Sequence, residues 1–92
     1  MASAEAWKHC FYNWPADLER RGVVVTNFDE QIPFDGFMVS PHLLLIERRT
    51  PDTLGARKLL LTYDNIVAIK LTEVVKNKSF QAFGFEESAP RK

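Results

Sequence analysis

The chain has 92 residues, and its twelve Lys and Arg side chains balance its twelve Asp and Glu side chains. The length predicts a single domain, the hydrophobic fraction of 46% excludes general disorder, and zero formal charge excludes a generic polyanion binder. One cysteine cannot close a disulfide within the chain, and the apolar runs fall far short of the roughly 20 residues that cross a bilayer.

Residues 1–22 are predicted to form an N-terminal helical segment. Three aromatic side chains recur there at helical spacing: Trp7, Phe11 and Trp14. Pro15 interrupts this pattern and suits the first turn of a second short helix, whose acids come early and bases late, with Gly22 as its stop. The segment therefore predicts two helices, the second over residues 15–21.

Residues 23–75 change to a β pattern. β-branched and apolar runs separated by turn residues predict strands over residues 23–28, 32–39, 43–46, 59–63 and 66–72. Gly36, inside the second run, indicates a bulge or sharp bend. Short antiparallel strands behind an N-terminal helix predict a mainly β fold, a small and strongly bent five-stranded barrel of the SH3-like kind.

Aromatic residues also mark the C-terminal extension, residues 76–92, whose final residues are expected to be disordered. Phe80, Phe83 and Phe85 lie in this extension. They and the N-terminal aromatic residues allow two interpretations. They either pack onto the barrel or form an interface with a partner, where Trp and Tyr are favoured.

Basic side chains flank the loop of residues 50–55, which we expect to be exposed. In a hairpin the pairs on either side of the loop approach each other and form a local basic patch of Arg48, Arg49, Arg57 and Lys58. Such a patch favours an RNA or acidic partner, especially if an oligomer repeats it. The alternative is ordinary solvated charge at strand ends.

No catalytic, metal-binding or cofactor-binding pattern is present in the sequence, so we expect a protein that is not an enzyme and needs no cofactor. Cys10 follows His9 directly, and neighbours on a helix do not face each other. These soft ligands are too few for a closed zinc site, and the glycines are isolated. The start of the chain lacks a signal-peptide pattern, so a cytoplasmic location without a membrane partner is expected.

The order of these elements resembles the Sm-like family, which includes LSm proteins and bacterial Hfq. The likeness covers about residues 15 to 73, with Gly36 in a bent second strand, an apolar third strand from Leu43, and a tight turn at Tyr63-Asp64-Asn65 before Ile66. The resemblance implies a homo-oligomeric ring, made by pairing the fourth strand of one subunit with the fifth strand of the next.

The residues with which that family reads RNA are mostly not matched. Ser40-Pro41-His42 stands where the first motif usually carries Asp and Asn, and Tyr63-Asp64-Asn65 replaces the Arg-Gly or Lys-His pair. The resemblance nevertheless places four residues at the RNA-contacting loops: Ser40, His42, Tyr63 and Asn65. His42 and Tyr63 are candidates for stacking on a base, and Asn65 for bonding a base edge, although all four also suit plain turns.

Two functions follow from this pattern. One is an Sm-like homo-oligomeric ring with single-stranded RNA as a candidate ligand. The other is a protein-interaction or structural small-barrel module with no role in nucleic-acid binding.

Overall fold

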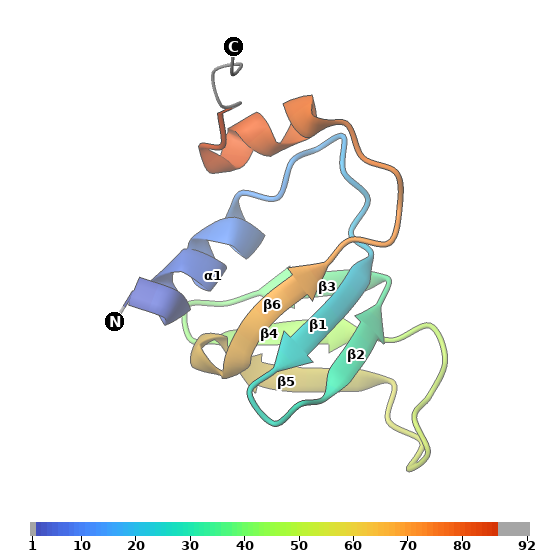
Figure 1. Cartoon of the computed structure of the whole chain (residues 1–92). Coiled ribbons are helices and arrows are strands. Elements are labelled where there is room, and N and C mark those ends of the chain that lie inside the picture. The colour runs from blue at the N-terminus through green and yellow to red at the C-terminus, as the bar shows by residue number, and fades with distance from the viewer. Residues whose placement is uncertain (1, 87–92) are drawn as a thin grey trace.

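The computed structural model describes residues 2–86 and shows a mainly β protein with an N-terminal helix, as the sequence predicts (Figure 1). Two short 3-10 helices, η1 (Tyr63–Asn65) and η2 (Asn77–Phe83), accompany one α-helix and six strands. In chain order these are α1 (Ala2–Tyr12), β1 (Gly22–Thr26), β2 (Gln31–Phe34), β3 (Gly36–Val39), β4 (Leu43–Glu47), β5 (Lys58–Thr62) and β6 (Ile66–Lys70).

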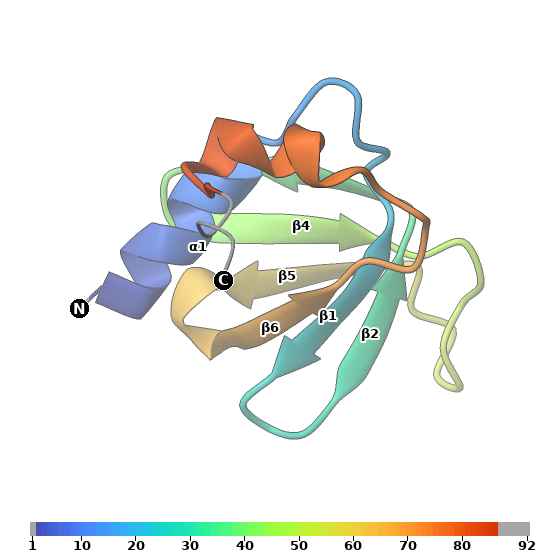
Figure 2. The ribbon, with the colours of Figure 1, turned by 45° about the horizontal axis from the view of Figure 1, so that its top comes forward.

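The strands form two three-stranded antiparallel sheets, one with the order β2-β1-β6 and the other with the order β3-β4-β5. Figure 2 shows the two sheets crossing at a marked angle. Only Asp35 separates β2 from β3, so the chain passes from one sheet to the other at that residue. The single strand predicted over residues 32–39 is therefore two strands, and the described chain has six strands where the sequence predicts five.

The core lies between the two sheets and is closed at one end by α1, which packs against η1 and β3. Alternate residues of each sheet point inward, as the burial of β1 at Gly22, Val24 and Thr26 shows. α1 and η1 contribute Phe11 and Tyr63. With these two, the buried apolar cluster comprises Val24, Ile32, Phe34, Phe37, Leu44, Ile46 and Ile66.

The second helix predicted over residues 15–21 is wrong, because this segment is a series of turns. The Leu18 N–H donates to the Pro15 carbonyl over 3.2 Å, and the Trp14 indole N–H donates to the Leu18 carbonyl over 3.0 Å. Leu18 is itself buried. A segment this short gains little from helix formation alone, so burial of Leu18 and Trp14 determines its path.

Gly22 is not a helix stop but the first residue of β1. It is buried, and a Cβ there would lie 2.5 Å from the backbone carbonyl oxygen of Lys70. Glycine is needed at this position because β1 and the end of β6 approach each other closely.

The C-terminal part of the described chain returns to the N-terminal helix. η2 lies beside α1 in both views (Figures 1 and 2). The disorder predicted for the final residues concerns positions 87–92, which lie outside the described residues. No helix within the described range combines the length and hydropathy that a membrane span requires.

Candidate functional site

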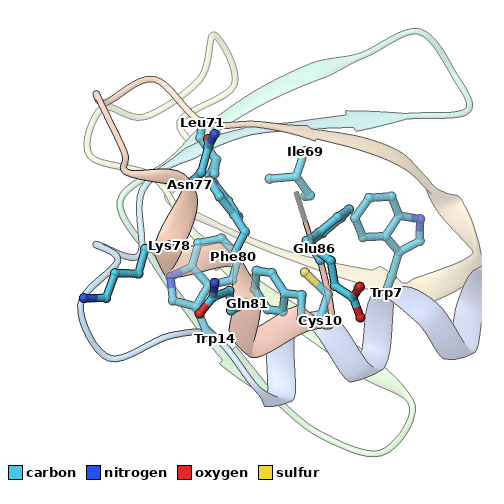
Figure 3. Close-up of a pocket in the computed structure, with 12 residues that line it drawn as sticks. Trp7, Cys10, Trp14, Ile69, Leu71, Asn77, Lys78, Phe80, Gln81 and Glu86 are labelled. Atoms are coloured by element: carbon cyan, nitrogen blue, oxygen red, sulfur yellow. The ribbon is translucent and has the colours of Figure 1, made fainter. Parts of the chain in front are cut away.

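A large apolar groove opens between α1, the end of β6 and η2 (Figure 3). Its volume is about 790 Å³, within the range of protein binding sites. Figure 3 shows Trp7, Cys10 and Ile69 around the same hollow, although they come from opposite ends of the chain. Apolar side chains dominate its lining, which also includes Trp14, Leu71, Phe80, Phe83 and Phe85. We call this feature the aromatic groove.

Trp14 connects the walls of the aromatic groove to the core. Its ring lies 5.1 Å from that of Phe37, centroid to centroid, and 6.2 Å from that of Phe83 in η2, both edge to face. Phe11, one helical turn before it, is buried and stacks on Trp14 at 5.6 Å. Such aromatic contacts fix the orientation of the rings, so α1 and η2 are held by the same cluster that fills the core.

Cys10 is the one thiol of the chain, and it lines the aromatic groove. The side chain is half-buried, and burial raises the pKa of its thiol from 9.0 to about 11. Because the thiolate is the nucleophilic form, this thiol is protonated and unreactive near neutral pH. The groove is therefore suited to apolar contact and not to nucleophilic chemistry.

The outer edges of β5 and β6 have no partner strand within residues 2–86. Just beyond the paired ends of β4 and β5, the Arg48 N–H donates to the Arg57 carbonyl over 2.8 Å. Along an antiparallel ladder, hydrogen-bonded pairs of residues alternate with non-bonded pairs. With Leu44 opposite Leu61, the N–H and C=O groups of Leu59 and Leu61 therefore face β4. Those of the intervening residues face the free edge: Lys58, Leu60 and Thr62.

In β6 the residue whose backbone groups face the free edge has an inward side chain, whereas in β5 the corresponding residue has an outward side chain. The Thr26 N–H bonds the Glu30 carbonyl, so Thr26 and Val24 face β2, and Val25 faces Ala68 in β6. Ile69 therefore directs its backbone groups to the free edge while its side chain enters the aromatic groove. A β-bulge at this edge leaves Val67 exposed.

Of the four residues predicted to contact RNA, the structure brings Ser40 and Tyr63 together. The Tyr63 hydroxyl donates to the carbonyls of Ser40 at 2.8 Å and Leu43 at 3.2 Å, and burial raises the pKa of its phenol. The residue is only 4% exposed, and it belongs to the buried core cluster. The stacking role predicted for Tyr63 therefore does not fit this structure, because its face is part of the core.

The other candidates occupy turns. The Ser40 hydroxyl donates to the Leu43 carbonyl and accepts from the Leu43 N–H, which closes the turn that carries exposed His42. Asn65 lies in η1, where its carbonyl accepts the Asn27 N–H at 2.9 Å. These hydrogen bonds tie Asn65 to the β1–β2 turn and Ser40 to Tyr63, so they do not gather the four residues into one site.

The predicted basic patch has acidic neighbours. Arg49 pairs with Asp35 at 3.2 Å, and Lys58 pairs with Glu47 at 3.4 Å. Arg48 and Arg57 are joined through their backbones, so the two flanks of the loop do approach each other. Asp52, inside the loop, accepts the Ala56 and Leu54 N–H groups, and these bonds lower the pKa of its carboxyl. The hairpin is thus a mixed-charge surface.

Comparisons with family models, with curated proteins and with solved structures find no match. Within residues 2–86, no group of three or more His, Cys, Asp or Glu side chains is placed to hold a metal ion. Sequence reasoning missed Ile69 and Leu71 as groove residues. The density of aromatic residues near both ends of the chain was the signal that marked its other walls.

Proposed function

We propose that this chain is the subunit of a homo-oligomer, assembled by antiparallel pairing of β5 of one copy with β6 of the next. If β2 and β3 are counted as one strand bent at Asp35, the strand order is β6-β1-β2/β3-β4-β5. We propose that this order corresponds to the five-stranded, strongly bent arrangement of an Sm-like small barrel. The observation that carries the proposal is the pair of unpaired strand edges at the two ends of this order.

Both edges are chemically suited to such pairing. β5 and β6 have five residues each and contain no proline, and Leu60 and Val67 are exposed on them at 64% and 54%. A free apolar edge is an aggregation hazard that proteins usually cover. Pairing unlike edges is a heterologous contact, which closes into a ring when the rotation between copies allows it.

The same geometry favours a protein-assembly module over a nucleic-acid binder. Tyr63 is buried, Arg49 and Lys58 face carboxylates, and the chain has no net charge. Single-stranded RNA is supported only by exposed His42 and by the basic side chains that an oligomer would repeat. A titration with short oligo-U and oligo-A at low and high salt tests this ligand, because phosphate binding weakens steeply with salt.

Light scattering coupled to size-exclusion chromatography tests the assembly. We expect an oligomer that dissociates on dilution, and a monomer at every concentration would overturn the proposal. Thr62→Pro is the sharper test, since Thr62 has φ −80° and ψ 151°, a conformation that proline adopts. This change removes one N–H from the free edge, whereas the control Thr62→Ala retains it.

Thr62→Pro should weaken association by about tenfold or more. One edge hydrogen bond is lost, and the pyrrolidine ring of the proline obstructs the neighbouring strand. The ladder between β4 and β5 is unaffected, because the Thr62 N–H does not face β4. Equal association of Thr62→Pro and Thr62→Ala would mean that the free edge of β5 is not the contact.

A further inference from the structure

We infer that Leu60 of one copy enters the aromatic groove of the next copy, so that the groove is the side-chain half of the strand contact. This inference rests on the proposed assembly. It adds a specific occupant to the groove between α1, β6 and η2, and it identifies the second copy as the ligand of that groove.

The backbone groups at the two free edges have defined directions. At the free edge of β5, the exposed N–H and C=O groups belong to Lys58, Leu60 and Thr62. At the free edge of β6 they belong to Ile69. When two antiparallel strands pair, residues that present these groups to each other stand directly opposite.

The side chains at these two edges also have defined directions. Residues that stand opposite each other in an antiparallel pair project from the same face of the sheet. Ile69 projects into the aromatic groove, and Leu71, just beyond β6, lines it as well. Every antiparallel register that bonds the two edges therefore places the Lys58, Leu60 and Thr62 side chains of the second copy on the groove side.

Leu60 and the aromatic groove also match in chemistry, since both are apolar and exposed. Leu60 points away from the core of its own chain and is 64% exposed, although Leu59 and Leu61 beside it pack against that core. The aromatic groove offers the rings of Trp7, Trp14 and the C-terminal phenylalanines and the side chain of Ile69. Contact between the two strands brings the exposed leucine against the open aromatic groove. Both apolar surfaces are then removed from water.

The structure also shows why the same chain does not fill its own groove with Leu60. Within one chain the ends of β5 and β6 are linked by η1, and Leu60 and Ile69 project from opposite faces, one outward and one inward. Pairing of these edges inside one chain would require both side chains on one face. The occupant must come from a second copy, which is free to present β5 in the required orientation.

The experiment compares Leu60→Ser with Met38→Ser in the full chain. Met38 is a matched control, since it is 61% exposed on the same outer face of the sheet as Leu60. It lies in β3, with Leu45 of β4 between the two residues, and is therefore away from the free edge of β5. Leu60→Ser should weaken association on the order of 10- to 100-fold, the loss expected for one buried leucine. Met38→Ser should leave association unchanged.

Tryptophan emission gives an independent readout, because both tryptophans of the chain line the groove. In a dilution series followed by light scattering, emission of the wild-type protein should shift to the blue as the oligomer forms. The assembled fraction of Leu60→Ser should show a smaller shift at equal occupancy.

The outcomes separate this inference from the proposal beneath it. If the wild-type protein assembles and Thr62→Pro disrupts it, but Leu60→Ser acts like Met38→Ser, the edge pairing stands and the groove contact is overturned. Assembly with unchanged tryptophan emission also overturns the groove contact. A wild-type protein that is monomeric throughout the series overturns both.

Discussion

When β2 and β3 are counted as one bent strand, β5 and β6 are the two end strands of the order, yet they are built in opposite ways. β5 is regular, and the residue that offers its backbone groups to the edge, Leu60, projects outward. β6 carries a bulge, and the corresponding residue, Ile69, projects inward beneath a groove. One edge therefore carries a projecting side chain and the other a recess, which favours contact between unlike edges over contact between two copies of the same edge.

The recess depends on the aromatic cluster, so the largest effect should come from removing Trp14. Its ring contacts Phe11, Phe37 and Phe83, and its indole N–H donates to the Leu18 carbonyl. Trp14→Ala should lower the free energy of unfolding by ~3–5 kcal/mol, the range for large aromatic residues in a core.

Urea unfolding measures this loss, with Tyr12→Ala as the control because Tyr12 is 47% exposed at the end of α1, two residues before Trp14. The Trp14→Ala protein should also lose assembly at temperatures where it is still folded, since one wall of the recess is gone. A loss of stability no larger than that of Tyr12→Ala would mean that α1 and η2 are not joined through this ring.

A charge on the free edge of β6 should weaken assembly and leave the fold intact. Val67 is the exposed bulge residue of β6, and lysine on an edge strand is a common device against strand addition. Val67→Lys should weaken association by about tenfold, with stability changed by less than ~0.5 kcal/mol. The control is Val74→Lys, at an exposed position outside the strands; dissociation constants from light scattering should differ between the two variants.

Tyr63, which lies between the two edges in η1, distinguishes a structural role from a ligand-binding one. Tyr63→Phe retains the ring but removes the hydroxyl that donates to the Ser40 and Leu43 carbonyls. We expect a loss of about 1 kcal/mol in thermal or urea unfolding, the usual contribution of one such group. Tyr12→Phe, on an exposed ring, should change nothing; equal stability of both variants would contradict the observed hydrogen bonds.

The sequence predicted most of the sheet because runs of β-branched and apolar residues locate strands from local information. Val23–Thr26 and Leu43–Ile46 are such runs, and β1 and β4 lie over them. The predicted helix at residues 15–21 failed because its charge order suited a helix while burial of Leu18 and the Trp14 hydrogen bond depended on the rest of the fold. Local preference lost to tertiary packing there.

The candidate site was predicted less well than the fold for a related reason. The aromatic groove joins Trp7, Ile69 and Phe80, which are far apart in sequence and become neighbours only after the sheets form. Likewise, Tyr63 stands in a turn sequence that suggests exposure, whereas its packing in the core cluster and its bond to the Ser40 carbonyl depend on the rest of the fold. Aromatic composition allowed an interaction surface but did not locate the groove beside the edge of β6.

The last prediction, which has no effect at neutral pH, concerns Cys10, the titratable thiol that lines the aromatic groove. Burial raises the pKa of this thiol to about 11, against 9.0 in the unfolded chain. Well below pH 9.0 the thiol is protonated in both states and contributes no pH dependence. As the pH rises above this value, the unfolded chain loses its proton first, so the unfolded state is favoured and stability falls until the folded thiol also ionises near pH 11.

Cys10→Ser removes this contribution, and the variant should therefore lose less stability than the wild-type protein between pH 9.0 and about 11. Urea unfolding of both proteins across that interval measures the difference, since the other titrating groups are common to both. Identical pH dependence of the two would show that water reaches the thiol as freely as in the unfolded chain. Such a result would contradict a dry, apolar recess beside β6, whereas the expected difference would distinguish this edge from the solvent-facing edge of β5.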